Sequence, residues 1–209
     1  MSVNRRNRET TDSSPIVNPD AEQFVPSGPS PQQALRGLFS DLIQRNFEEA
    51  VHLRDHDIEE YIADLLLRFI RAEDVFQIRD KHGRTLEDVG EMLITSNPLL
   101  DAPSFDAERE TRRHIGDFIL FFAGLFPESI NHWRLRRARL DALLDYIQTG
   151  KESYYIVSEF KEFEYRATAP LFRKMSEEFE RCVFGLNLVK RDFERLQHQS
   201  YVRVKTILS

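Results

Sequence analysis

The sequence has few of the residues that build disulfides and tight loops. Cys182 is the only cysteine among 209 residues, so the chain cannot form an internal disulfide and nothing in it indicates an oxidising compartment. The eight glycines are scattered singly, without a phosphate-binding glycine loop or a Gly-x-Ser-x-Gly nucleophile motif. The sequence therefore lacks the signatures of a disulfide scaffold, a nucleotide-binding loop and an α/β hydrolase.

Long apolar runs are also missing. The first residues, MSVNRRNRETTDSSP, contain no apolar stretch of the kind that a secretory signal needs. The most apolar window, residues 115–126 (IGDFILFFAGLF), is shorter than a membrane-spanning helix and contains Asp117. We therefore expect a soluble cytoplasmic protein with no transmembrane segment.

A strong excess of either charge is absent too. Lys and Arg number 29 against 35 Asp and Glu, and the formal net charge of −6 argues against wholesale binding to nucleic acid or to an anionic membrane. What the chain does have is material for a core, since 41% of its residues are hydrophobic and 16 are Phe. This length and composition predict one globular domain.

The apolar pattern predicts an all-α fold, a single-domain helical bundle of about six helices with one short extended turn near residues 75–86. In that turn, Asp80 and Gly83 match the first and fourth positions of a type I turn. Residues 1–29 are rich in proline and polar residues, which predicts a disordered tail. The helical domain then covers residues 30–199, and residues 200–209 are predicted to form a frayed C-terminus.

Polar caps mark where the helices begin. Ser30, Pro31 and Gln33 match an N-cap, a proline at the first helical position and a capping-box glutamine. By the same reasoning, later helices are predicted to begin at Asp57, at Thr85 with Asp88, near Asp106, and near Thr168 with Pro170.

Two interpretations of Gly150 are open. Apolar residues from Leu140 to Ile147 recur at helical spacing, and the period continues to Tyr154. One interpretation is a helix that runs through Gly150 to about Phe163, with the glycine allowing another helix to approach closely. The other is that Gly150 is a C-cap that ends the helix.

A polar stripe runs along the predicted helix at residues 106–126. From Ile115 onward this helix is otherwise apolar on nearly every side and is therefore expected to be buried by its neighbours. Within the stripe, His114 and Asp117 are three residues apart and share a face. Together with Tyr154 or Tyr155 they form a candidate polar cluster around a pocket, able to hold a metal or move protons. The alternative interpretation is that Arg113 and His114 pair with Asp117 and satisfy it within the core.

Other metal and nucleophile motifs are incomplete. Glu49 and His52 form the only Glu-x-x-His pair, whereas a di-iron bundle needs two. His56 and Asp57 spell the dipeptide of all-helical metal phosphohydrolases, which also need a separate upstream histidine. The only upstream histidine, His52, is too close to supply a ligand from another helix, and Asp57 as a helix cap explains the dipeptide. Cys182 falls on the apolar face of the last predicted helix and is expected to be inert. We therefore expect no metal ion and no cofactor.

A basic segment surrounds the only tryptophan. HWRLRR places Trp133 beside Arg134, Arg136 and Arg137, a composition that suits either a solvated helix face or a contact with phosphates. Because the whole chain is acidic and has no helix-turn-helix pattern, nucleic-acid binding is disfavoured. Trp and Arg are favoured interface anchors, so the same surface is a candidate for contact with an acidic protein partner or with another copy of the chain.

Four stretches resemble a group of uncharacterised bacterial proteins: YIADLLLRFIRAEDVFQIRD, HIGDFILFFAGLFPESI, YIQTGKESYYIVSEF and EFERCVFGLNLVKRDF. The similarity extends from about residue 34 to residue 194. It implies a bacterial, soluble, helical protein, and it carries no activity, ligand or catalytic residue.

The leading functional hypothesis is a non-enzymatic, cytosolic interaction or regulatory protein, because the sequence has a well-built core and no assembled chemistry. Its partner would meet the surface near Trp133 or the N-terminal tail. The second hypothesis is a small-molecule- or metal-binding helical protein, including an enzyme, that uses His114, Asp117 and Tyr154.

Overall fold

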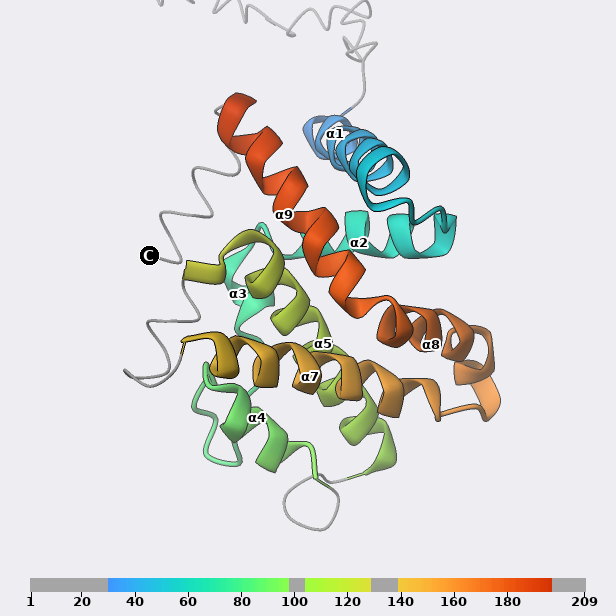
Figure 1. The fold of residues 1–209 in the computed structure, drawn as a ribbon. Coiled ribbons are helices and arrows are strands. Elements are labelled where there is room, and N and C mark those ends of the chain that lie inside the picture. Colours follow the sequence, from blue (N-terminus) through green and yellow to red (C-terminus); the bar gives the residue numbers. More distant parts are fainter. Residues whose placement is uncertain (1–29, 98–103, 129–138, 197–209) are drawn as a thin grey trace, which may run out of the picture.

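The computed structural model describes residues 30–97, 104–128 and 139–196 of the chain (Figure 1). Within these ranges the regular elements are helices, and the β contact is one antiparallel bridge between Arg79 and Thr85. The all-α prediction is therefore confirmed. The predicted disordered tail, residues 1–29, and the predicted frayed C-terminus, residues 200–209, lie outside the described residues.

The helices agree with the predicted number of about six. The first five predicted helices correspond to α1, α2, α4, α5 and α7. The last predicted helix, which begins near Thr168, is divided into two helices, α8 and α9. A four-residue helix, α3, was not predicted. In chain order the elements are α1 (Pro31–Asn46), the π-helical turn η1 (Phe47–Val51), α2 (His56–Arg68), α3 (Ala72–Val75), α4 (Val89–Thr95), α5 (Phe105–Leu125), α7 (Arg139–Ser158), the 3₁₀ turn η2 (Phe163–Ala167), α8 (Ala169–Glu177) and α9 (Phe179–Leu196).

Some of the predicted helix caps are confirmed and two are wrong. Ser30 caps α1, with its side chain accepting from the backbone N–H of Gln33, which bonds back to it. Helix α2 is capped by Asp55 and not by Asp57, because Asp55 lies one residue before the first helical turn and accepts from two N–H groups there. Helix α4 is capped by Asp88 alone, since Thr85 is held in the β bridge.

The extended turn near residues 75–86 is confirmed. The N–H of Gly83 donates to the carbonyl oxygen of Asp80 over 2.9 Å, and the N–H of Leu86 donates to the carbonyl oxygen of Ile78 over 2.8 Å. Gly83 has a φ of +80°, which a residue without a Cβ adopts at little cost. This turn connects α3 to α4 on one side of α5.

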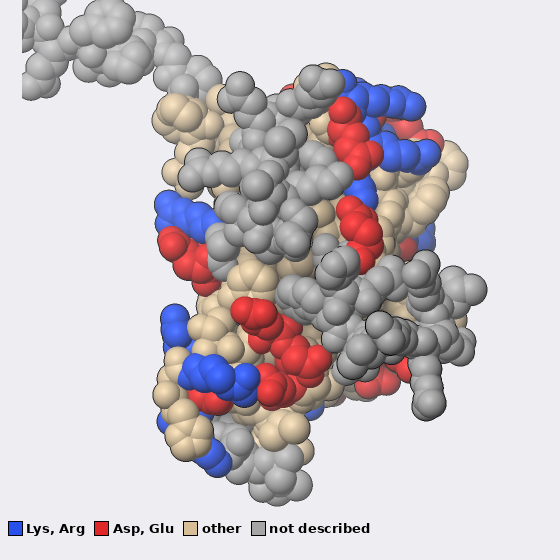
Figure 2. Space-filling view, turned by 90° about the vertical axis from the view of Figure 1, so that its left-hand side faces the viewer, with Lys and Arg blue, Asp and Glu red and all other residues tan. Residues whose placement is uncertain are grey.

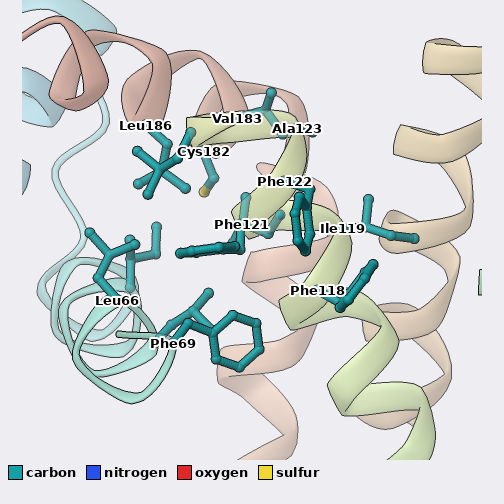
Figure 3. Packing of buried hydrophobic residues seen from close by; sticks show 14 of the residues in the cluster. Leu66, Phe69, Phe118, Ile119, Phe121, Phe122, Ala123, Cys182, Val183 and Leu186 are labelled. Atoms are coloured by element: carbon teal, nitrogen blue, oxygen red, sulfur yellow. The ribbon is translucent and has the colours of Figure 1, made fainter. Parts of the chain in front are cut away.

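Helix α5 lies at the centre of the molecule, with α7 in front of it, α9 above and α4 below (Figure 1). Every residue from His114 to Phe126 is buried, as the sequence predicts for a helix that is apolar all round. Phe121 points between Phe69 at the end of α2 and Leu186 of α9, as Figure 3 shows. The rings of Phe69 and Phe121 meet edge to face at 5.1 Å.

Helix α7 runs through Gly150, so the C-cap interpretation is wrong and the close-approach interpretation is confirmed. A Cβ at Gly150 would overlap Phe179 of α9 and would lie 2.8 Å from Cγ2 of Ile119 in α5. The helix ends at Ser158 and not at Phe163, because its last turn tightens: the N–H of Phe160 donates to the carbonyl oxygen of Val157.

The described surface carries charges of both signs close together. Figure 2 shows Lys and Arg beside Asp and Glu on one side of the molecule. Arg84, for example, contacts both Asp80 and Glu91 at about 3 Å. None of the described helices combines the length and the apolar content needed to cross a membrane.

Candidate functional site

Asp117 of α5 lies at the centre of a buried hydrogen-bond network. Its side chain is inaccessible to solvent. The Tyr61 hydroxyl of α2 donates to Oδ1 over 2.6 Å, and the Tyr154 hydroxyl of α7 donates to the same oxygen over 2.7 Å. Nη2 of Arg68 donates to Oδ2 over 3.0 Å. Asp117 therefore connects three helices, and the structure brings together two members of the predicted polar cluster, Asp117 and Tyr154.

The third predicted member, His114, faces a different neighbour. Its Nε2 lies 3.0 Å from the carbonyl oxygen of Val75, and its Nδ1 lies 2.6 Å from the side-chain amide nitrogen of Gln77. The ring therefore carries its proton on Nε2, donates to Val75 and accepts from Gln77. It contacts the segment after α3 and has no hydrogen bond with Asp117 in the structure.

Neither Arg113 nor His114 is hydrogen-bonded to Asp117 in the structure, so the alternative interpretation is wrong about the hydrogen-bond partners. The Asp117 carboxylate does act on Arg113 through its charge, because against the lowering effect of burial it helps to raise the pKa of the guanidinium. Residues three apart on a helix differ by about 60° in direction, so His114 points toward α3 while Asp117 points toward α2 and α7. Both hydrogen bonds of Arg113 go to Glu110, one turn earlier on α5. The acid is satisfied within the core, as that interpretation required, but by Tyr61, Tyr154 and Arg68.

Burial sets the protonation states in this region. Desolvation lowers the pKa of His114 to about 4, so the ring is neutral at pH 7. Desolvation, together with the nearby Asp117 carboxylate, raises the pKa of the Tyr61 and Tyr154 hydroxyls well above the ordinary tyrosine value. Both hydroxyls therefore remain hydrogen-bond donors to Asp117 across the physiological pH range.

A concavity of about 430 Å³ lies beside His114, between α5 and the turn after α3. Gln77, Arg79 and Arg113 contribute to its walls. The His114 side chain is itself almost fully buried, and both ring nitrogens are used by the protein. The concavity therefore offers a ligand no free histidine nitrogen.

No three His, Cys, Asp or Glu side chains of the described ranges gather in a way that suits a metal ion. Cys182 is fully buried, and desolvation raises the pKa of its thiol far above the ordinary value, which keeps it protonated and unreactive. The predicted interaction residues Trp133, Arg134, Arg136 and Arg137 lie outside the described residues.

A second candidate site lies where the start of α5 meets the end of α7. There a groove of about 540 Å³ opens to the surface, and we call it the aromatic groove. Its apolar walls come from three elements and the connection between them: Phe105, Ile156, Phe160, Phe163 and Tyr165. The sequence interpretation did not identify this site.

Two phenylalanines of the aromatic groove project into solvent. Phe163 is 87% exposed and Phe105 is 73% exposed. Phe163 also has a left-handed backbone, with a φ of 51°, a conformation that bulky residues seldom adopt. Such strain is found most often at functional sites, where the surrounding structure holds it in place.

The neighbours of Phe163 fix this geometry. Tyr165, two residues later, donates its hydroxyl to Oδ1 of Asp106 in α5 over 2.9 Å. The guanidinium carbon of Arg109 lies 4.0 Å from the centre of the Tyr165 ring, and Phe160 meets the same ring edge to face. Turn η2 is thereby attached to the start of α5, with the Phe163 ring left outside.

Carboxylates dominate the charged lining of the aromatic groove. Asp106, Glu108, Glu159 and Glu162 contribute to it, against the single ammonium group of Lys161. Lys161 and Glu159 are paired with each other, with their closest atoms 3.2 Å apart. The aromatic groove therefore combines exposed rings with net negative charge.

No family model, curated protein or solved structure matches this chain. The bacterial origin implied by the resemblance accordingly stays a prediction. Function has to be argued from the geometry of the chain itself.

A sequence signal for the aromatic groove does exist in retrospect. The segment FKEFEY at 160–165 mixes three aromatic residues with charged ones, just after the apolar period of α7 ends. Aromatic residues outside a helical stripe have no predicted core position, so their presence indicates either a second small core or an exposed patch. The structure shows the exposed patch.

Proposed function

We propose that this protein is a non-enzymatic, cytosolic interaction protein that binds a protein partner through the aromatic groove. The observation that carries the proposal is Phe163, whose ring is 87% exposed on a left-handed backbone beside the similarly exposed Phe105. Exposed aromatic patches with a polar rim are typical of protein interfaces.

The energetics favour a partner. Burying a phenylalanine side chain gains about 1.5–3 kcal/mol relative to leaving it in water. The left-handed backbone at Phe163 costs roughly 1–3 kcal/mol with or without a partner, so the gain on binding comes from burial of the ring. A partner that covers Phe105 and Phe163 would recover the burial energy, and aromatic anchors of this kind commonly dominate the binding energy of an interface.

The alternative hypothesis, a ligand or metal site on His114, Asp117 and Tyr154, receives less support. The three donors around Asp117 already use both of its oxygens, and the two nitrogens of His114 are both hydrogen-bonded within the protein. A ligand at either residue would have to displace a buried partner, which costs about 1–3 kcal/mol for each group left unpaired.

The test is capture of partners from the native lysate with tagged full-length chain. Phe163→Ser and Phe105→Ser remove the exposed rings, and Phe184→Ser is the matched control, because Phe184 is 53% exposed on α9 and does not line the groove. Proteins retained by the wild type and by the control but lost from both groove variants support the proposal. An identical set of retained proteins for all four chains contradicts it.

A further inference from the structure

We infer that the aromatic groove receives the basic segment 132–137 (HWRLRR) of a second copy of this chain. This inference rests on the function proposed above and names the partner. Two features favour this occupant: the chemistry of the groove and the segment is complementary, and the length of α7 prevents a chain from filling its own groove.

The groove and the segment are complementary in charge and in residue type. Four carboxylates line the groove, Asp106, Glu108, Glu159 and Glu162, of which Glu159 already contacts Lys161 and Arg173. The segment offers three guanidinium groups, from Arg134, Arg136 and Arg137. Arginine is the residue best suited to carboxylates at an interface, because its planar fork forms paired hydrogen bonds. The segment also holds the only tryptophan of the chain, an aromatic anchor of the size that exposed phenylalanine rings can enclose.

Aromatic rings at this end of the molecule already hold guanidinium groups. Arg109 lies over Tyr165, a lining residue of the groove, at 4.0 Å. Arg173 lies over the neighbouring Tyr155 at 4.6 Å. Arginines of an incoming segment would meet exposed rings of the same kind at Phe105 and Phe163.

A chain cannot place this segment in its own groove. Helices α5 and α7 are antiparallel, since Gly116 meets Tyr154 while Gly150 meets Ile119. The groove is therefore at the C-terminal end of α7, whereas the segment joins α7 at Arg139, and the two ends of this 20-residue helix are about 28 Å apart. A fully extended chain from Arg139 back to Trp133 spans only about 21 Å.

The resulting contact is head to tail. The groove lies at one end of the α5–α7 pair, and the segment joins the described chain at the other end, so each copy has one groove and one segment to contribute. Such a contact closes either as a reciprocal two-fold dimer, in which each copy's segment enters the other's groove, or as a larger ring, and otherwise it extends as an open chain of subunits. Assembly held by charge and aromatic contacts weakens as salt screens the charges.

The experiment uses purified full-length chain in sedimentation velocity from about 1 to 200 µM. We expect self-association that weakens at high salt. The association constant should fall by about tenfold or more in Phe163→Ser and in Trp133→Ser but not in Phe184→Ser. Mixing Phe163→Ser, which keeps the segment, with Trp133→Ser, which keeps the groove, should give a 1:1 dimer that grows no further. Trp133 is the only tryptophan, so a blue shift of its emission with concentration in the wild type reports its burial.

Two results separate this inference from the proposed function. A chain that stays monomeric across the concentration range overturns self-association, even where groove-dependent capture from the lysate persists and the proposed function stands. Self-association that is unchanged in Phe163→Ser overturns the groove as its site. Absence of both self-association and groove-dependent capture overturns the inference and the proposed function together.

Discussion

Replacing Asp117 by alanine tests whether the buried network is structural. The substitution removes the acceptor for two buried tyrosine hydroxyls, Tyr61 and Tyr154, and the partner of Arg68. Each hydroxyl left unpaired in the core costs about 1–3 kcal/mol. Arg68 adds little, because its side chain is 35% exposed and can be solvated. We therefore expect Asp117→Ala to lower the free energy of unfolding by about 2–6 kcal/mol, the sum for the two unpaired hydroxyls.

The assay is urea denaturation followed by far-UV circular dichroism. Asp64→Ala is the matched control, because Asp64 also accepts from an arginine, Arg36, over 2.9 Å, but its side chain is 55% exposed. An exposed ion pair contributes less than about 1 kcal/mol, so the control should unfold almost as the wild type does. A loss below about 1 kcal/mol for Asp117→Ala would refute the reasoning, because a satisfied buried acid cannot be removed so cheaply.

Three further predictions follow from burial and backbone geometry. The pKa of His114 is about 4 in the folded chain and about 6.5 in the unfolded chain, so the unfolded state binds more protons between these pH values. The free energy of unfolding therefore falls by about 3 kcal/mol as the pH drops from 6.5 to 4. His114→Gln should flatten that part of a curve of stability against pH. Gly150→Ala should lower the free energy of unfolding, measured by urea denaturation, by about 1–3 kcal/mol, because the added methyl group would overlap Phe179. Gly37→Ala, which has open space around it, should leave the free energy of unfolding unchanged or raise it. Phe163→Gly should keep or raise the melting temperature, because glycine relieves the left-handed backbone, while it abolishes capture of the partner; a large drop in melting temperature would contradict this.

Local signals in the sequence predicted the helices well. Ser30 and Gln33 are three residues apart and cap each other, so the start of α1 is readable from the residues themselves. Where two candidate caps stand close together the same rule is ambiguous. Asp55 and Asp57 both precede the apolar period of α2, and only the structure shows that Asp55 takes the N-cap position.

Long-range contacts could not be predicted in the same way. The sequence placed Asp117 on a buried face, but its partners Tyr61 and Arg68 come from α2, some fifty residues earlier, and no spacing rule connects them. The aromatic groove depends on the left-handed turn at Phe163 and on the meeting of α5 with α7. A tertiary arrangement of this kind is not encoded in the period of either helix.

The most direct test of the central claim is photocrosslinking from the aromatic groove. A photoreactive phenylalanine analogue at position 163, in full-length chain at native concentration, should form a crosslinked product with a protein partner. Mass spectrometry then identifies that partner as another copy of the chain or as a different protein. The same analogue at position 184, on an exposed part of α9, serves as the control. A product that is specific to position 163 is the result we predict. Equal or absent crosslinking at the two positions would show that the groove is not where this protein binds.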